Sequence, residues 1–89
     1  MNVLFDASFE KSLRKLKNKD VQQNILEVIL SLEQAVNLRD VPNVKKMEGF
    51  KTYYRVKLGQ YRLGFELINP NTVLLILVAH RKDIYRYFP

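Results

Sequence analysis

The hydrophobic pattern of this chain changes its period between residues 40 and 53, and this change limits the possible folds more than any other feature of the sequence. In residues 6–36, apolar side chains recur every three or four positions, which indicates amphipathic helices. In residues 53–67, apolar and polar side chains alternate, which indicates half-buried β-strands. This order predicts an α+β domain in which an antiparallel sheet packs against a pair of helices.

The N-terminal part predicts one strand followed by two helices. The apolar residues 1–5 read as a short strand, and Asp6 or Ser8 is the expected N-cap of the first helix. After a short break, Asp20 with Gln23 resembles a capping box at the start of the second helix. The short connection predicts an antiparallel helical hairpin. The expected apolar stripes are Phe5, Phe9, Leu13 and Leu16 in the first helix and Val21, Ile25, Val28, Ile29, Leu32 and Val36 in the second.

The C-terminal half predicts three strands joined by tight turns, after a connector at residues 40–51. Glycine is the first residue of the Gly59-Gln60 pair, as in a two-residue type II′ hairpin turn. Residues 69–72 fit a type I turn between the second and third strands. The third strand, residues 72–81, is almost continuously apolar and is therefore expected inside the sheet with both faces covered. Together these strands form an antiparallel meander in one twisted sheet.

Composition and charge exclude several classes of protein. At 89 residues the chain has room for one domain, residues 1–89, and without cysteine it has no disulfide scaffold and no thiolate metal site. The longest apolar run, residues 73–79, is far too short to span a membrane, and no signal-peptide pattern opens the chain, so a cytoplasmic protein is expected. The net charge of +6 favours phosphate polyanions, acidic proteins or anionic membrane surfaces as partners. A solvated, lysine-rich surface is the alternative.

The predicted hairpin gathers three cations on one face. Around a two-residue turn, Lys57 lies opposite Arg62. Two residues further from the turn, Arg55 lies opposite Gly64, which would leave an open patch of sheet. Like charges in directly opposite positions destabilise a sheet by a few tenths to about 1 kcal/mol, so this placement indicates a function. A solvated polar face, partly neutralised by Glu66, is the structural alternative.

A second polar group, His80, Arg81, Lys82 and Tyr85, follows the third strand and lies near the hairpin if the strands pair in sequence order. The chain has no metal-ligand spacing, Ser-His-Asp arrangement or phosphate-binding glycine loop. Clustered cations with a phenol suit transesterification of an RNA phosphate, because guanidinium groups stabilise the negative charge that develops. Crowding by other cations favours the neutral amine of Lys57, which makes it a candidate general base.

The RelE branch of the RelE/ParE toxins of bacterial type II toxin-antitoxin systems resembles this chain in two segments, NVKKMEGFKTYYRVKLGQYRLGFEL and VLLILVAHRKDIYRYF. The resemblance implies a small α+β fold with two helices against a twisted antiparallel sheet. It also implies cleavage of mRNA in the ribosomal A site, with contacts to 16S rRNA and without a metal or other cofactor. The implied partners are this ribosome-bound mRNA and a cognate antitoxin that wraps and inhibits the toxin. No membrane is implied, and no DNA contact except through an antitoxin complex.

The resemblance also suggests a role for each matching residue. Lys57 is the candidate base, and Arg55 and Arg62 would hold the phosphate. Arg81 would stabilise or protonate the leaving group, and Tyr85 would stack on a base or assist proton transfer.

His80 and Lys82 complete the expected site as substrate-binding residues. Arg55 stands at a position that is lysine in some active members, and His80 stands where others carry a different cation, so the role of His80 stays open. Two other functions also stay open. One is a ParE-like toxin that inhibits DNA gyrase, against which the retained cations and Tyr85 argue. The other is a non-catalytic basic module that binds RNA or an acidic antitoxin.

Overall fold

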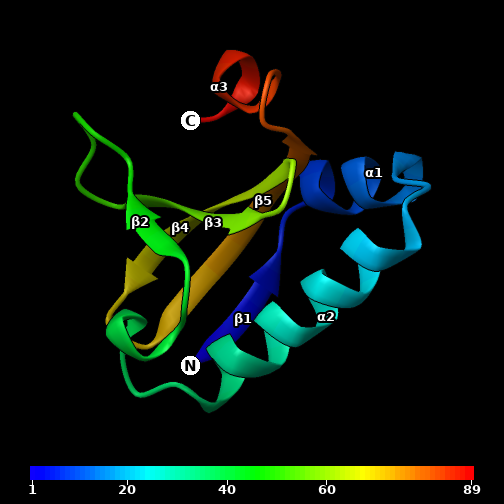
Figure 1. Cartoon of the computed structure of the whole chain (residues 1–89). Coiled ribbons are helices and arrows are strands. Elements are labelled where there is room, and N and C mark those ends of the chain that lie inside the picture. The colour runs from blue at the N-terminus through cyan, green and yellow to red at the C-terminus, as the bar shows by residue number, and fades with distance from the viewer.

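The computed structural model describes residues 1–89 and has the α+β fold that the sequence predicts (Figure 1). The expected strand, helix pair and three further strands occur in that order, with β2, η1 and α3 in addition. None of the helices combines the length and the apolar composition needed to cross a membrane. The elements are β1 (Asn2–Phe5), α1 (Ala7–Lys15), α2 (Lys19–Gln34), the 3-10 helix η1 (Leu38–Asp40), β2 (Val44–Lys46), β3 (Tyr53–Leu58), β4 (Tyr61–Asn69), β5 (Thr72–His80) and α3 (Ile84–Tyr87).

The five strands form one sheet in the order β1-β5-β4-β3-β2. β1 pairs with β5 in parallel, and all other neighbours are antiparallel, which confirms the predicted meander of β3, β4 and β5. β5 lies inside the sheet, between β1 and β4, as its apolar sequence indicated. Its Val73, Leu75 and Val78 are buried in the core, whereas the residues between them are only half-buried.

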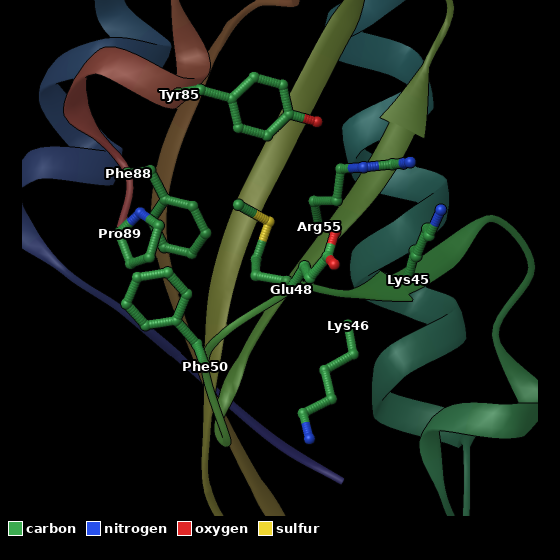
Figure 2. A pocket seen from close by; sticks show the side chains of 9 residues that line it. Lys45, Lys46, Glu48, Phe50, Arg55, Tyr85, Phe88 and Pro89 are labelled. Atoms are coloured by element: carbon green, nitrogen blue, oxygen red, sulfur yellow. The ribbon is translucent and has the colours of Figure 1, made fainter.

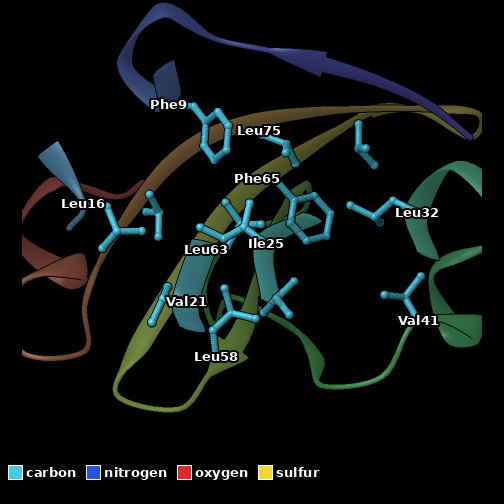
Figure 3. Close-up of a cluster of buried hydrophobic side chains, with 13 residues drawn as sticks. Phe9, Leu16, Val21, Ile25, Leu32, Val41, Leu58, Leu63, Phe65 and Leu75 are labelled. Carbon is cyan, nitrogen blue, oxygen red and sulfur yellow. The ribbon is translucent and has the colours of Figure 1, made fainter. Parts of the chain in front are cut away.

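The hydrophobic core lies between the two helices and one face of the sheet (Figure 3). The apolar stripe of each helix supplies part of this core, and alternate residues of β3, β4 and β5 supply the rest. On the opposite face, β3 and β4 carry polar side chains, and Phe88 packs over Gly64 of β4. The core residues are Phe9, Leu16, Val21, Ile25, Leu32, Val41, Val56, Leu58, Leu63, Phe65, Val73, Leu75 and Val78.

Two serines of α1 form hydrogen bonds with backbone groups at the edge of β5, beyond the point where β1 ends. β1 pairs only with residues 72–75 of β5, which leaves later backbone groups of that strand without a strand partner on this side. The Ser8 hydroxyl shares its single proton between the Asp6 carboxylate and the carbonyl oxygen of Ile76, which is 2.7 Å away, and the Ser12 hydroxyl accepts from the Val78 N–H at 3.1 Å. Because unpaired edge groups invite pairing with other chains, α1 protects this edge.

The ends of the second helix differ from the prediction. Asn18, rather than Asp20, is the N-cap of α2, and its side-chain oxygen accepts the backbone N–H groups of Asp20 and Val21 at 3.0 and 3.1 Å. The capping-box pattern misled because an asparagine two residues earlier already satisfies these donors. The helix ends at Gln34, and Val36 is 80% exposed rather than part of the apolar stripe.

The expected connector at residues 40–51 contains a strand, so that part of the prediction was wrong. Asn43, at φ 66°, has the left-handed conformation that asparagine tolerates better than most residues, and β2 begins immediately after it. β2 pairs antiparallel with β3, with Lys45 directly opposite Arg55. A strand of three residues is too short to show a hydrophobic period, so only its partner reveals it.

The β3–β4 hairpin has the predicted register, with Leu58 opposite Tyr61. Gly59 has φ 60° and Gln60 has no positive φ, as a type II′ turn requires. This turn places the alternate side chains of both strands as the sequence predicted, with the apolar set toward the helices.

Asp6 is the N-cap of α1, as predicted, and its pH dependence can be tested. Its carboxylate accepts the Ser8 hydroxyl and, at 3.0 Å, the Ser8 backbone N–H. These hydrogen bonds, chiefly the one from the hydroxyl, lower the pKa of Asp6 below its ordinary value of 3.8. Since the folded-state pKa is the lower one, the stabilisation is present above the unfolded-state value and is lost as the pH falls through the folded-state value.

We therefore expect Asp6→Ala to lower the Tm at about pH 7, and the difference from wild type to shrink toward about pH 2. Thermal melting followed by circular dichroism at a series of pH values measures both. A difference that stays constant over this range would contradict the assigned cap.

Candidate active site

Two pairs of cations face each other across neighbouring strands. Lys57 of β3 is directly opposite Arg62 of β4, and Arg55 of β3 is directly opposite Lys45 of β2. All four side chains lie on the face of the sheet that is turned away from the helices, because the residues that alternate with Lys57 are core residues. We call these four residues the cation face. The structure thus brings together Arg55, Lys57 and Arg62, as the hairpin pattern predicted, and adds Lys45.

Arg62 is fixed at the hairpin turn. Its Nη1 donates to the carbonyl oxygens of Gly59 at 2.7 Å and Tyr61 at 2.9 Å. One nitrogen makes both bonds, so the other N–H groups of the guanidinium remain for a ligand. The position of this charge is therefore set by the turn rather than by a carboxylate.

Arg81 lies beside the same turn. Its backbone N–H donates to the carbonyl oxygen of Gln60 at 2.7 Å, which continues the β4–β5 pairing one residue beyond the end of β5. The side chains of Arg81 and Lys82 are exposed. Arg81 therefore stands next to the end of the hairpin that Arg62 occupies.

His80 lies on the other face of the sheet. It is opposite Tyr61 in the β4–β5 register, and the two rings meet edge to face with centroids 5.5 Å apart. The Nδ1 of His80 accepts the backbone N–H of Lys82 at 3.2 Å, which places the proton of the neutral ring on Nε2. His80 lines a cavity of about 620 Å³ on the helix side, together with Lys15 and Lys17. The structure therefore does not bring His80 to the cation face.

Tyr85 and Arg55 line a second cavity of about 470 Å³ (Figure 2). Tyr85 is on α3 and is 57% exposed, and in Figure 2 its hydroxyl points to the side of the cavity where Arg55 lies. The cavity combines cations with aromatic rings, which suits a nucleotide better than a purely apolar ligand. Its lining residues are Lys45, Lys46, Met47, Glu48, Phe50, Arg55, Tyr85, Phe88 and Pro89.

The expected open patch at Gly64 is filled by the chain itself, so that prediction was wrong. Phe88 is only 2% exposed, and a Cβ built on Gly64 would lie 2.6 Å from its ring. Tyr53 meets the same ring edge to face, with centroids 5.5 Å apart. Glycine is thus required here for the close approach of Phe88. This packing holds the segment that carries Tyr85 against the sheet.

Glu66 does not neutralise the cation face by pairing with one of its four residues, as the alternative of a solvated polar face suggested. Its carboxylate accepts the hydroxyl of Thr52 at 3.0 Å, and in the register it lies opposite Tyr53 rather than a cation. No group of three or more His, Cys, Asp or Glu side chains is placed to hold a metal ion.

Comparison with known proteins identifies the family. The family described as "ParE toxin of type II toxin-antitoxin system, parDE" matches residues 3–85. The chain belongs to the RelE/ParE toxins. Within this family, the chain is 37% identical over 90 residues to toxin RelE3 of Methanocaldococcus jannaschii, with 100% of each chain covered. It is thus a RelE-family toxin of a type II toxin-antitoxin system, which confirms the resemblance.

Solved structures of RelE toxins have the same fold. One is the RelB-RelE antitoxin-toxin complex from Methanococcus jannaschii, with a TM-score of 0.78 at 34% identity, covering 97% of this chain and 99% of that chain. Another is the archaeal RelE-RelB complex from Pyrococcus horikoshii OT3, with a TM-score of 0.70 at 25% identity, covering 90% and 93%.

Sequence reasoning missed two residues in this RelE-family toxin. Lys45 lies in the strand that was read as a connector, and only its pairing with Arg55 places it on the cation face. Phe88 lies in a tail too short to show a pattern, although the aromatic residues at its end were a signal of burial.

Proposed function

We propose that this RelE-family toxin is an endoribonuclease that cleaves mRNA in the ribosomal A site and so arrests translation. The observation that carries the proposal is the cross-strand pairing of Lys57 with Arg62 without an acidic partner in the register, beside Arg55, which shares a cavity with the exposed Tyr85. Such an arrangement weakens the sheet slightly, and a bound phosphate relieves the repulsion. The place of action is the cytoplasm, where ribosomes are.

In this mechanism, the chain's own residues move the protons of an RNA transesterification. Lys57 accepts the proton of the 2′-hydroxyl, and the 2′-oxygen then attacks the adjacent phosphorus. Arg55 and Arg62 bind the non-bridging oxygens and stabilise the negative charge that the transition state gathers. Arg81 or Tyr85 supplies the proton to the departing 5′-oxygen, which leaves a 2′,3′-cyclic phosphate and a 5′-hydroxyl. No metal ion takes part.

Two of the residues expected to bind the substrate take a peripheral place in this proposal. Lys82 is exposed next to Arg81 and can contact the RNA backbone outside the reacting phosphate. His80 is on the helix side, so any contact that it makes is with a part of the RNA or ribosome that reaches around the sheet. Its Nδ1 is already used in the turn that carries Lys82.

An antitoxin is the second proposed partner. Two relatives with the same fold were solved as complexes of RelE with RelB. By this similarity, we infer that a RelB-like protein binds the chain and blocks its activity. The net charge of +6 favours an acidic antitoxin.

Induction of the protein in growing cells tests the proposed activity. We expect immediate arrest of translation, and mRNA cut between codon positions in the ribosomal A site with 2′,3′-cyclic phosphate ends. Primer extension locates the cuts, and end-specific ligation identifies the phosphate. Arrest of growth with intact mRNA and gyrase-linked DNA damage would instead assign the chain to the gyrase-inhibiting toxins. Binding of RNA without any cleavage would show that the protein is a non-catalytic binding module.

A further inference from the structure

We propose that Lys45 is an RNA-binding residue that holds the phosphate next to the one that is cleaved, with Arg55 shared between the two phosphates. This inference rests on the proposed function, since it extends the same site to a second nucleotide. Its basis is the register of β2 against β3, in which Lys45 is directly opposite Arg55. In Figure 2 the side chains of Lys45 and Arg55 extend to the same side of the cavity, whereas Lys46 points away from them.

Arg55 and Lys57, one from each cation pair, are spaced like successive phosphates. They are two residues apart on β3, and a strand rises about 3.4 Å per residue, so their Cα atoms are separated by about 7 Å. This is close to the distance between neighbouring phosphates in an extended single strand of RNA. A row of cations with this spacing can follow a nucleic-acid backbone, with Lys57 and Arg62 at the cleaved phosphate, Lys45 at its neighbour and Arg55 between them.

The cavity beside the second pair has room and partners for a nucleotide. Its polar lining consists of Lys45, Lys46, Arg55 and one carboxylate, Glu48, and Tyr85 and Phe50 supply aromatic surface. Phe50 is 44% exposed and meets Tyr53 edge to face. A base attached to the second phosphate would find rings on which to stack, which makes binding tolerant of sequence.

A lysine on an edge strand can have a purely protective role, because edge lysines discourage pairing of the strand with other chains. β2 is an edge strand, and both of its lysines line the cavity, but they differ in the residue that lies opposite each of them. Lys45 faces Arg55, whereas Lys46 is opposite Tyr54, whose ring packs on the core residue Phe65. Protection of the edge needs either lysine, whereas binding of a phosphate needs Lys45.

Lys45→Ala separates these explanations, and Lys19→Ala is its control for general charge, because Lys19 is an exposed lysine at the start of α2 and lies outside the cavity. The probe is a short single-stranded RNA with 2′-O-methyl groups throughout, which binds but cannot be cleaved. We expect Lys45→Ala to raise its Kd about tenfold at low salt, and to reduce the slope of log Kd against log salt by about 0.7, the value for one lost phosphate contact. Lys19→Ala should change both quantities much less, and Lys45→Arg should restore them.

Stability provides the folding control. Lys45→Ala removes a like-charge neighbour of Arg55, so the Tm should be unchanged or slightly raised. Equal Kd and equal salt slope for Lys45→Ala and wild type would overturn the inference. Equal losses for the two alanine variants would also overturn it, in favour of general charge.

Failure of the proposed function has a different signature. In that case the protein binds the methylated RNA with the Lys45-dependent slope but never cuts mRNA on ribosomes. Cleavage that proceeds normally with an unchanged Kd in Lys45→Ala refutes the Lys45 inference alone.

Discussion

Lys57→Ala is expected to reduce the rate of mRNA cleavage on ribosomes by about 10²–10⁴-fold, the contribution of a general base. Lys57 is exposed, lies outside the core and is opposite another cation. Loss of its charge therefore removes repulsion and leaves the Tm equal or slightly raised. A single-turnover cleavage assay on programmed ribosomes measures the rate, and thermal melting measures the Tm.

Lys19→Ala is the matched control, because Lys19 is an exposed lysine at the start of α2, on the helix side of the molecule. It should leave both the cleavage rate and the Tm unchanged. A large fall in Tm for Lys57→Ala would assign the lysine a structural role. Cleavage at the wild-type rate would remove it from the mechanism.

Arg62→Ala should also reduce the cleavage rate, but its effect on stability should differ from that of Lys57→Ala. A donor that stabilises developing negative charge contributes about 10²–10³-fold to a rate. The side chain also bonds two carbonyl oxygens at the hairpin turn, at 2.7 and 2.9 Å. Removal of those bonds offsets the relief of repulsion, so Arg62→Ala should be less stable than Lys57→Ala. This difference in stability arises because only Arg62 bonds to the carbonyl oxygens of the turn, and the alternation of residues in the sequence does not predict it.

Phe88→Ala is expected to lower the free energy of unfolding by about 3–5 kcal/mol, a large part of the 5–15 kcal/mol that holds a typical domain. The ring is 2% exposed and fills the space above Gly64. In a domain of this size, such a loss corresponds to a fall in Tm of more than about 10 °C. Since α3 precedes Phe88 directly, the variant should also lose cleavage activity through displacement of Tyr85.

Gly64→Ala tests the same contact from the other side. In wild type its Cβ would lie 2.6 Å from the ring of Phe88, so we expect destabilisation by about 1–3 kcal/mol. In the Phe88→Ala background the space is empty. There the alanine should cost nothing, or stabilise slightly, because glycine is the poorer strand residue.

Urea denaturation of the two single variants and the double variant measures this coupling. Additive losses would show that the two residues do not touch in solution. Tyr87→Ala is a suitable control in the same segment, because that ring is 69% exposed and its loss should change stability little.

The hairpin was predictable in full from its residues. Alternation in residues 53–67 sets which side chains share a face, and the Gly59-Gln60 turn sets which of them are opposite. Both are local properties, governed by neighbours a few positions away. The grouping of Arg55, Lys57 and Arg62 follows from them without any knowledge of the rest of the fold.

Other parts of the candidate site depend on contacts between distant segments. β2 is a strand only because β3 lies beside it, and its pairing brings Lys45 to Arg55. His80 was grouped with the cations because it is close to Arg81 in sequence, yet alternation along β5 places it beside Tyr61 on the helix side. A strand of three residues, such as β2, is too short to show a hydrophobic period. For a residue at the end of a strand, such as His80, the face of the sheet on which it lies is known only once its cross-strand partner is known.

The sequence by itself therefore determined the α+β class, the order of the main elements and the three cations on one face of the hairpin. Only the tertiary structure decided that Lys45 extends this face and that Phe88 closes the sheet over Gly64. The physical reason is that backbone conformation and alternation are fixed within a few residues. The packing of a C-terminal ring against a glycine in β4 depends instead on the shape of the assembled sheet.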